Sequence, residues 1–324
     1  MQILAVDDDT HIREIIPMIT RKVGFPHVTT VGSGDEALAL LDTVSEAYEC
    51  LLLDINMPGM DGIELCGLVR KLPAHRKTPI IMLTAMTDKE YLDRAFKAGA
   101  TDYITKPFDI VELGARLRVA KELITARKEM AQLIASIGDD HPASQRHTFA
   151  LTDPITISGP EHLVDYVALG NYLTQLSRAG ASSSQVMAIK IDRINAIYDR
   201  ATEQEYTYAL TETAEAIGQV LRQQKNLMAY AGSGMFMVVS SYATLEPPRE
   251  LEAAIQNLLD ERDTEYDNGD PLDIEVSIGN PMRPNTSRTQ GVKKTFERAL
   301  ARAENRFQRK LSEPRPLNIR LVGG

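Results

Sequence analysis

Carboxylates stand at the ends of two short apolar stretches near the start of this 324-residue chain. Asp7 and Asp8 follow residues 2–6, and Asp54 follows residues 50–53. Two unit charges about 4 Å apart interact by about 4 kcal/mol near a protein surface, so three clustered carboxylates require a cation. Oxygen ligands without a nearby His or Cys suit a hard ion, and a site with few protein ligands suits Mg²⁺ better than Ca²⁺. These residues therefore predict a magnesium site beside an acceptor carboxylate.

A hydroxyl and an ammonium group complete the candidate site. Thr84 ends the apolar stretch 80–83, and Lys106 follows the stretch 102–104. A carboxylate nucleophile, a metal that neutralises phosphoryl oxygens and a lysine that pairs with them are the parts needed for phosphoryl transfer to an aspartate. The predicted reaction is formation of an acyl phosphate.

Five strand–helix units must position these residues. The expected strands cover residues 2–6, 27–31, 50–53, 80–83 and 102–104, and the expected helices begin near residues 10, 35, 61, 89 and 109. Strands this apolar, alternating with helices, indicate a parallel sheet that is covered on both faces. Ligands of such sheets bind beyond the carboxyl ends of the strands, where the strand order reverses. The fold class expected for this part is doubly wound α/β.

The last of these helices is expected to continue beyond the sheet. Its apolar residues recur in steps of three and four from Leu113 to Ile134, which predicts a helical stalk able to dimerise. The alternative is a long amphipathic helix that packs on its own domain. Gly138 ends the pattern, and the polar residues up to about His147 are typical of a linker.

The order of elements changes after about residue 150. Helices are expected over 160–178, 202–222, 248–260 and 293–308, strands over 186–191 and 274–278, and a hairpin over 228–240. The hairpin turn contains Gly232-Ser-Gly234, and glycine supplies the positive φ that such turns require. This order predicts an α+β domain with an antiparallel element, followed by a tail from Ser312.

Composition excludes several classes of protein. The net charge of −9 gives no chain-wide attraction to nucleic acid or to anionic lipid. Cys50 and Cys66 are the only cysteines and lie in apolar segments, which favours buried thiols in a reducing compartment. No apolar run approaches the roughly 20 residues that cross a bilayer, and the N-terminal run is too short for a signal peptide. We therefore expect a cytoplasmic protein without membrane insertion and without a nucleic-acid partner.

Four motifs of the first part are similar to those of a known family. They read Val6-Asp7-Asp8, Asp54-Ile-Asn-Met-Pro-Gly-Met-Asp-Gly62, Leu83-Thr84-Ala85 and Tyr103-Ile-Thr-Lys106-Pro107. In order and spacing they resemble the receiver domain of bacterial two-component response regulators over about residues 1–120. The resemblance implies a flavodoxin-like fold with five parallel strands, and phosphorylation by a histidine kinase or a phosphotransfer protein.

The same resemblance implies the ligands of the metal. Asp54 accepts the phosphoryl group, Asp8 binds Mg²⁺ directly and Asp7 binds it mainly through water. Asn56 contributes its backbone carbonyl. The expected metal-binding set is therefore Asp7, Asp8, Asp54 and Asn56.

The resemblance also implies a conformational switch. Lys106 holds the phosphoryl group, the hydroxyl of Thr84 moves toward that group, and Tyr103 turns inward in response. The peptide bond between Lys106 and Pro107 is expected to be cis. Receivers of this family often dimerise through the fourth helix, fifth strand and fifth helix, so a homodimer is expected.

The second half has landmarks of a different family. They are Leu151-Thr-Asp-Pro154, Ile189-Lys-Ile-Asp192, the hairpin and Val276-Ser-Ile-Gly279. They resemble the GGDEF family of diguanylate cyclases, which implies a palm-like α+β domain. Condensing two GTP molecules requires carboxylates that bind two metal ions.

Several positions depart from the GGDEF pattern. The family's metal-binding Asp falls on Lys190, and the signature turn reads Gly232-Ser-Gly-Met-Phe236, with Gly and Met where the acids belong. The family's guanine, phosphate and product-site positions are occupied by Tyr198, Glu304, Gln223 and Asn226. Catalysis and product feedback are both expected to be lost.

The sequence thus predicts a response regulator in four parts. They are a receiver domain over 1–120, a helical stalk and linker over 121–150, a degenerate GGDEF-like domain over 151–311 and a tail over 312–324. Output is expected to pass through contact with an unidentified downstream protein, and the second domain is expected not to be an enzyme. Two alternatives stay open: a diguanylate cyclase that makes cyclic di-GMP from GTP, and a nucleotide-sensing domain in which Lys190 replaces the charge of the metal.

Overall fold

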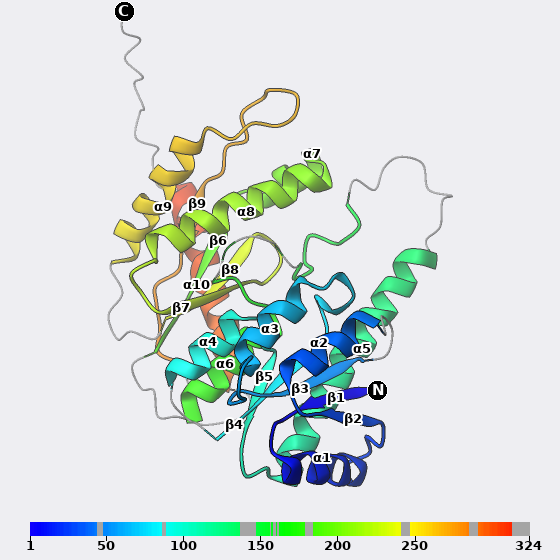
Figure 1. The fold of residues 1–324 in the computed structure, drawn as a ribbon. Helices are drawn as coiled ribbons and strands as arrows, with labels where there is room; N and C mark the ends of the chain where they lie inside the picture. The colour runs from blue at the N-terminus through cyan, green and yellow to red at the C-terminus, as the bar shows by residue number, and fades with distance from the viewer. Residues whose placement is uncertain are drawn as a thin grey trace, which may run out of the picture. The chain divides into compact units, whose positions relative to one another are not determined.

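The chain forms two compact units in the computed structural model (Figure 1). The first unit contains Met1–Thr148 and Glu161–Ala181, and the second contains Phe149–Pro160 and Ser182–Gly324. The structure describes residues 1–43, 48–85, 89–136, 147–155, 157, 160, 162–178, 184–240, 247–284 and 291–312. Most of the expected linker and all but the first residue of the expected tail lie outside these ranges.

The first unit is built around a five-stranded parallel sheet in the order β2-β1-β3-β4-β5. The strands are β1 (Ile3–Val6), β2 (Val28–Val31), β3 (Cys50–Asp54), β4 (Ile80–Thr84) and β5 (Asp102–Thr105). Strand β1 pairs with β2 on one side and with β3 on the other, so the strand order reverses there. A doubly wound sheet places its ligand at such a point. The expected fold class of the first part is confirmed.

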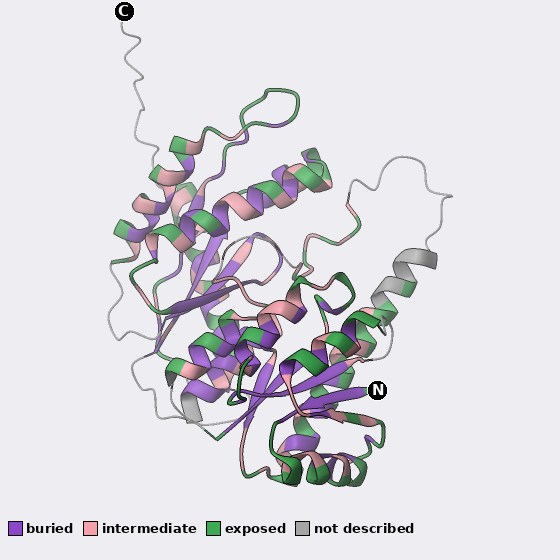
Figure 2. Ribbon diagram, in the orientation of Figure 1, coloured by how far each residue is buried: buried purple, intermediate pink, exposed green. Residues whose placement is uncertain are grey.

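Helices cover both faces of this sheet. They are α1 (Thr10–Lys22), α2 (Gly34–Thr43), α3 (Gly62–Lys71), the short η1 (Pro73–His75), α4 (Lys89–Lys97), α5 (Ile110–Ser136) and α6 (Tyr166–Arg178). Alternate strand residues such as Ile3 and Leu52 form one core with Ile16 of α1 and Leu117 of α5. Figure 2 shows the inner strands β1, β3 and β4 as buried and the helices as buried along one side, whereas the edge strand β2 is buried only at Val31. This packing holds the carboxyl ends of the strands in fixed positions.

Helix α5 continues well beyond the sheet, as its apolar pattern predicts. It runs without a break from Ile110 to Ser136. Near its middle, Arg127 donates to the carbonyl oxygen of Lys77, and Lys128 forms an ion pair with Glu49. At these residues the helix lies against loops of its own unit.

The second unit contains a four-stranded antiparallel sheet in the order β7-β8-β6-β9. The strands are β6 (Gln185–Ile191), β7 (Asn226–Tyr230), β8 (Met235–Ser240) and β9 (Val276–Ile278). The helices are α7 (Ile194–Arg200), α8 (Glu203–Val220), α9 (Pro248–Arg262) and α10 (Gly291–Ser312). Helix α10 approaches the sheet so closely that a Cβ on Gly279 would lie 2.6 Å from the backbone nitrogen of Ala303. The expected α+β class is confirmed.

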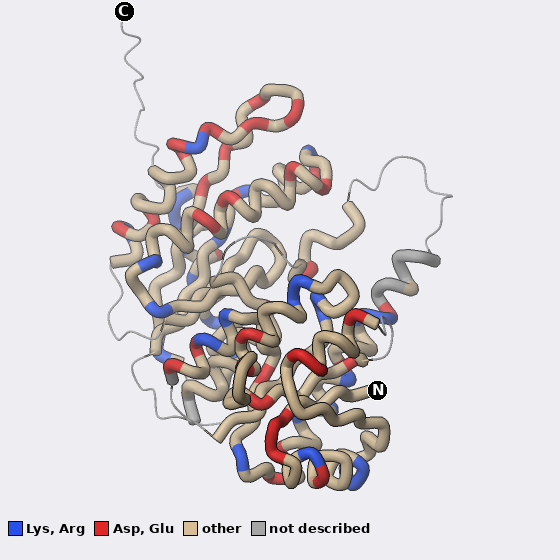
Figure 3. Tube along the Cα trace, viewed as in Figure 1, with Lys and Arg blue, Asp and Glu red and all other residues tan. Residues whose placement is uncertain are grey.

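The charged residues, the apolar length of the helices and the two cysteines can be located in the structure. Figure 3 shows acidic and basic positions interspersed along the described trace. Within that part of the chain, no helix combines the length and the apolar character needed to cross a membrane. Cys50 and Cys66 are both buried and unpaired, and burial raises the pKa of their thiols to about 12 and about 11.

Candidate functional site

Two buried carboxylates and one ammonium group meet at the carboxyl ends of β1, β3 and β5. The Lys106 Nζ atom lies 2.7 Å from Asp7 Oδ2 and 2.9 Å from Asp54 Oδ2. Asp7 is fully buried and Asp54 is 4% exposed. These residues are 47 and 52 positions apart in the sequence, and only the parallel sheet brings them together.

Asp8 completes an acidic cluster with Asp7 and Asp54. One carboxylate oxygen from each lies within 4.8 Å of the other two, and Asp8 is the exposed member. Three carboxylates and the Lys106 ammonium leave a formal charge of −2 at this site. A divalent cation with oxygen ligands matches that charge and this donor set. Among the described residues, no other group of three His, Cys, Asp or Glu side chains is placed to hold a metal.

The start of α1 fixes the two N-terminal aspartates. Asp9 caps the helix by accepting from the backbone N–H of His11 at 2.8 Å, and its own N–H donates to Asp7 Oδ1 at 3.1 Å. Arg13 donates to the backbone carbonyl oxygens of Asp7 and Asp8 at 2.7 and 2.9 Å. Sequence reasoning missed Arg13, although its place in the first turn of the helix after the acids could have suggested this contact.

The loop after β3 orients Asp54. The backbone N–H of Asn56 donates to the Asp54 carboxylate, and Gly62 donates its N–H to the carbonyl oxygen of Ile55 at 3.1 Å. A Cβ on Gly62 would lie 2.0 Å from the carbonyl oxygen of Asp54. This position therefore requires glycine, because backbone atoms cannot give way as a flexible side chain can.

Gly62→Ala is expected to lower the free energy of unfolding by about 3 kcal/mol, because the new methyl group overlaps fixed backbone. Gly67→Ala is the matched control on the same helix, since nothing lies within 4 Å of its Cβ position. That control should raise the free energy of unfolding by about 0.5–1 kcal/mol through helix propensity. Urea unfolding of both variants measures the difference, and equal stabilities would contradict the close approach.

The remaining predicted residues line the ends of β4 and β5. Thr84 ends β4 and is 3% exposed, and its carbonyl oxygen accepts from the backbone N–H of Lys106 at 2.7 Å. Tyr103 lies in β5 and is also buried. The peptide bond between Lys106 and Pro107 is cis, which confirms the expectation drawn from the receiver resemblance.

The charges of the site are strongly coupled. Burial raises the pKa of Asp54 above its ordinary value, and the hydrogen bond and charge of Lys106 offset part of that rise. Burial would lower the pKa of Lys106, but the hydrogen bonds and charges of Asp7 and Asp54 outweigh it, so its pKa is raised. Lys106 therefore carries its positive charge at neutral pH. A fixed cation beside a buried carboxylate can attract and hold an anionic group.

Among the residues of the second unit that the structure describes, no comparable acidic cluster is placed to hold a metal. Lys190 of β6 forms an ion pair with Glu304 of α10 at 3.1 Å, and its ammonium lies 5.3 Å from the ring centre of Phe307. Only 10% of the Lys190 side chain is exposed. The positive charge of Lys190 is thus neutralised by Glu304 within the fold.

Asp192, two residues further on, is also held within the fold. It accepts from Lys310 Nζ at 2.9 Å and from the hydroxyl of Ser277 at 3.0 Å. Burial raises its pKa, and Lys310 and Ser277 offset part of the rise. This carboxylate already has a cationic partner.

The hairpin turn keeps its backbone shape without acidic side chains. Gly232, Ser233 and Gly234 all have positive φ. Ser233 donates its N–H to the carbonyl oxygen of Leu151 at 2.7 Å, and a Cβ on Gly232 would lie 2.1 Å from the carbonyl oxygen of Thr152. The turn therefore packs against the start of the unit.

Tyr198 of α7 is part of an aromatic group. Its ring centre lies 5.2 Å from that of Tyr206 and 6.3 Å from that of Phe149, and its hydroxyl donates to the carbonyl oxygen of Phe149. Asn226 is buried and donates to the carbonyl oxygens of Leu221 and Gln224 at 2.9 and 2.8 Å. Both side chains therefore have structural partners.

Comparison with known families identifies both parts of the chain. Residues 3–118 match the family model of the response regulator receiver domain. Residues 165–310 match the family model described as diguanylate cyclase, GGDEF domain.

Individual relatives match the first part. The DNA-binding response regulator MtrA of Mycolicibacterium smegmatis is 38% identical over 138 residues, which are 43% of this chain and 57% of MtrA. The transcriptional regulatory protein ResD of Bacillus subtilis is 39% identical over 117 residues, 36% of this chain and 46% of ResD. The chain thus spans about half the length of these relatives. A structure of the chemotaxis protein CheY4 of Vibrio cholerae matches with 34% identity and a TM-score of 0.35, covering 37% of this chain and 97% of CheY4.

The sheet order, the acidic cluster beside Lys106 and the two family models agree on the composition of the molecule. The chain carries a response regulator receiver domain in its first part and a GGDEF domain, of the diguanylate cyclase family, in its second part.

Proposed function

We propose that this protein is a phosphorelay response regulator that accepts a phosphoryl group on Asp54 from a histidine kinase or a phosphotransfer protein. The observation that carries the proposal is the convergence of Asp7, Asp8 and Asp54 on Lys106 at the point where the strand order reverses. Labelling of the full chain by a radioactive phosphoryl donor, compared with an Asp54 variant, tests it.

In this proposal each side chain has a separate task. A carboxylate oxygen of Asp54 attacks phosphorus, and the bond from the donor to phosphorus breaks as the new oxygen–phosphorus bond forms. Lys106, now 2.9 Å from Asp54 Oδ2, is placed to pair with a phosphoryl oxygen. Thr84 and Tyr103 carry the change to β4, β5 and their neighbours.

We assign Mg²⁺ to Asp7, Asp8 and Asp54, together with the backbone carbonyl of Asn56. The donor set fits, because it is made of oxygen atoms only and its formal charge of −2, with Lys106 included, is balanced by the +2 charge of a divalent cation. When bound, the ion neutralises phosphoryl oxygens during transfer.

Asp8→Asn is expected to weaken Mg²⁺ binding about tenfold, because the site loses one of its three charged ligands. Asp9→Asn is the matched control, since Asp9 lies outside the cluster and asparagine caps a helix as well as aspartate does. Titration calorimetry of the full chain with MgCl₂ measures both affinities. Equal affinities of the two variants would contradict the assignment.

We further propose that the GGDEF domain is catalytically inactive. The charges expected of a cyclase are reversed at two positions, Lys190 and Glu304, and these two side chains neutralise each other at 3.1 Å. The turn from Gly232 to Gly234 offers no carboxylate. At the position where two bound metal ions would require an acidic ligand, the chain therefore has the buried ammonium group of Lys190.

The output of such a domain is contact with another protein, and we propose that the receiver also forms a homodimer when phosphorylated. A pull-down with the wild-type chain and with Asp54→Ala, each incubated with a phosphoryl donor, tests the output. Proteins captured equally by both chains would contradict a phosphorylation-dependent partner. Sedimentation with and without beryllofluoride, a mimic of the phosphoryl group, tests the dimer.

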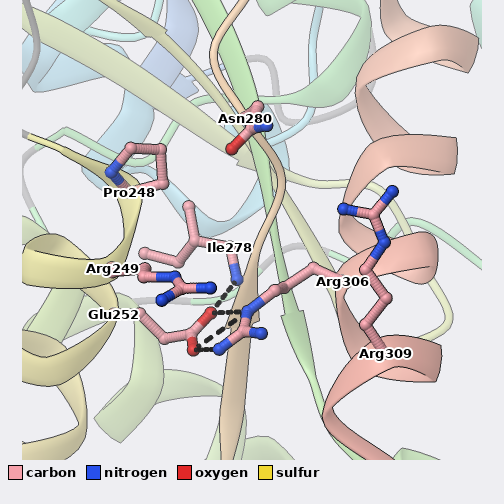
Figure 4. Close-up of a pocket in the computed structure, with 7 residues that line it drawn as sticks. All are labelled: Pro248, Arg249, Glu252, Ile278, Asn280, Arg306 and Arg309. Atoms are coloured by element: carbon pink, nitrogen blue, oxygen red, sulfur yellow. Dashed lines mark hydrogen bonds and ion pairs between the residues drawn. The ribbon is translucent and has the colours of Figure 1, made fainter. Parts of the chain in front are cut away.

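One observation favours the second candidate, binding of a phosphorylated ligand. The second unit contains a pocket of about 160 Å³, and its lining side chains are drawn in Figure 4. It is lined by Pro248, Arg249, Glu252, Ile278, Asn280, Arg306 and Arg309. Arg306 is bound to Glu252, with its Nη2 atom 2.6 Å from Oε1. In the described part of the chain, the guanidinium groups of Arg249 and Arg309 have no such partner.

Titration calorimetry with GTP and with cyclic di-GMP tests this candidate. If the pocket binds either ligand, exchanging both Arg249 and Arg309 for glutamine should weaken binding at least tenfold. Arg298→Gln, on the same helix but outside the pocket, is the control. The absence of binding to the wild-type chain would leave protein contact as the function of this domain.

A further inference from the structure

The sequence of helix α6 is matched by the GGDEF family model, but its contacts place the helix in the first compact unit, that of the receiver. The GGDEF family model begins at residue 165, so it covers the whole of α6. The contacts of Glu161–Ala181 nevertheless place this segment in the compact unit of the receiver. The helix packs there against α4 and β5.

The centre of this contact is a buried tyrosine. Tyr172 is 1% exposed, and its hydroxyl donates to Asp93 Oδ1 of α4 at 2.6 Å. Its ring meets the ring of Phe96 edge to face, with centres 5.4 Å apart. The other oxygen of Asp93 is buried without a hydrogen-bond partner. Loss of the tyrosine hydroxyl would therefore leave a buried carboxylate with no partner on this side.

Two amides extend the contact to β5. Asn171 Nδ2 donates to the carbonyl oxygen of Thr101 at 3.0 Å, and Gln175 Nε2 donates to Asp102 Oδ1 at 3.4 Å. Asp102 also accepts from Arg116 of α5 at 2.8 Å and from the backbone N–H of Tyr103 at 2.9 Å. One buried carboxylate thus connects α6 to the residue for which the receiver resemblance implies an inward turn.

These contacts are specific because they pair buried polar groups. Tyr172, Gln175, Asp93 and Asp102 are each less than 9% exposed. Buried polar groups are costly unless they find partners with good geometry. A displacement of α4 or β5 relative to α6 would break several of these pairs together.

We propose that the face formed by α4 and β5 is the docking surface for this chain's own α6, and that phosphorylation of Asp54 weakens the docking. The second half of this statement rests on the proposed function. Both elements of this face are connected along the chain to the phosphoryl-acceptor site. Helix α4 is the next helix after Thr84, and β5 ends one residue before Lys106. The contacts of α6 fit the arrangement in which Lys106 bridges Asp7 and Asp54. A phosphoryl group draws Lys106 and Thr84 away from that arrangement.

Hydrogen–deuterium exchange of the full chain tests the docking. Tyr172→Phe keeps the ring beside Phe96 and removes the hydroxyl, so exchange in peptides from α6 should become about tenfold faster. Thr174→Ala is the matched control on the same helix, because the hydroxyl of Thr174 donates to the carbonyl oxygen of Gly170 within α6 and makes no hydrogen bond to α4 or β5 among the described residues. Equal exchange rates in the two variants would overturn the docking.

Beryllofluoride with Mg²⁺ tests the coupling in the same proteins. It should speed exchange in α6 of the wild-type chain about tenfold and have a smaller effect in Tyr172→Phe. Because coupling between sites is reciprocal, Tyr172→Phe should also bind beryllofluoride more tightly. Unchanged or slower exchange in α6, with beryllofluoride bound as shown by ¹⁹F NMR, would overturn the coupling. Absence of a bound ¹⁹F signal would instead overturn the proposed function, while the Tyr172→Phe comparison still decides the docking.

Discussion

Asp54→Asn is expected to lower phosphorylation of the full chain by about 10³-fold or more, because the amide oxygen cannot replace the attacking carboxylate. The substitution keeps the size of the side chain. It removes one of the two carboxylates paired with Lys106. The Lys106 ammonium keeps its ion pair with Asp7, which lies 2.7 Å away, so neither of these two groups is left without a partner. Incubation with radiolabelled acetyl phosphate and Mg²⁺, followed by electrophoresis, measures the label per molecule.

The control for this result is Glu64→Gln. Glu64 is an exposed carboxylate in the first turn of α3, ten residues from Asp54, so its variant should be labelled as fully as the wild-type chain. Unfolding of both variants by urea checks that each is folded. Label retained on Asp54→Asn would show that another residue accepts the phosphoryl group.

The full chain is expected to make cyclic di-GMP from GTP and Mg²⁺ at less than about 10⁻³ of the rate of a working cyclase. The expectation follows from the loss of metal-bound charge stabilisation, which is worth several kcal/mol in the transition state. Lys190 stands where the metal needs an acid and is paired with Glu304. The turn at Gly232–Gly234 supplies no second acid.

Lys190→Asp sharpens this test. It restores one acid but leaves the turn unchanged, so it should also be inactive. Product analysis by chromatography, with a known cyclase as the positive control, measures both proteins. Cyclic di-GMP formed by the wild-type chain in proportion to its concentration would contradict the proposed inactivity.

The receiver fold and the position of its site could be predicted from the sequence because local and global signals agree. The strands β1, β3 and β4 are short, mainly apolar runs, and the helix over 89–97 has the bounds that the sequence predicts. Parallel strands bring their carboxyl ends to one edge, so Asp7, Asp54 and Lys106 could be placed together before any distance was known. Their ion pairs depend only on this topology.

The second half shows where local signals fail. The expected helix at Pro160 begins instead at Tyr166, because proline suits a first helical turn without requiring one. Helix α7 was missed, since it has only seven residues and begins after Arg193 in the left-handed region, where no side chain caps it. Short helices of this kind are set by packing more than by propensity.

The docking of α6 could not be predicted, because its partners are distant in the sequence. Tyr172 and Asp93 are 79 residues apart, and Gln175 and Asp102 are 73 apart. Spacing along the helix identifies Tyr172 and Gln175 as possible members of a buried face but does not identify what covers them. The partner of the receiver's α4–β5 face could not be predicted either, since any amphipathic helix could have covered it.

The most direct test of the account is to map the phosphorylated residue itself. The full chain is incubated with a phosphoryl donor, reduced with borohydride to convert an acyl phosphate to an alcohol, and digested for mass spectrometry. The account predicts one modified residue, Asp54, and no modification when Mg²⁺ is removed by a chelator. Modification of a different residue, or of Asp54 without Mg²⁺, would contradict it.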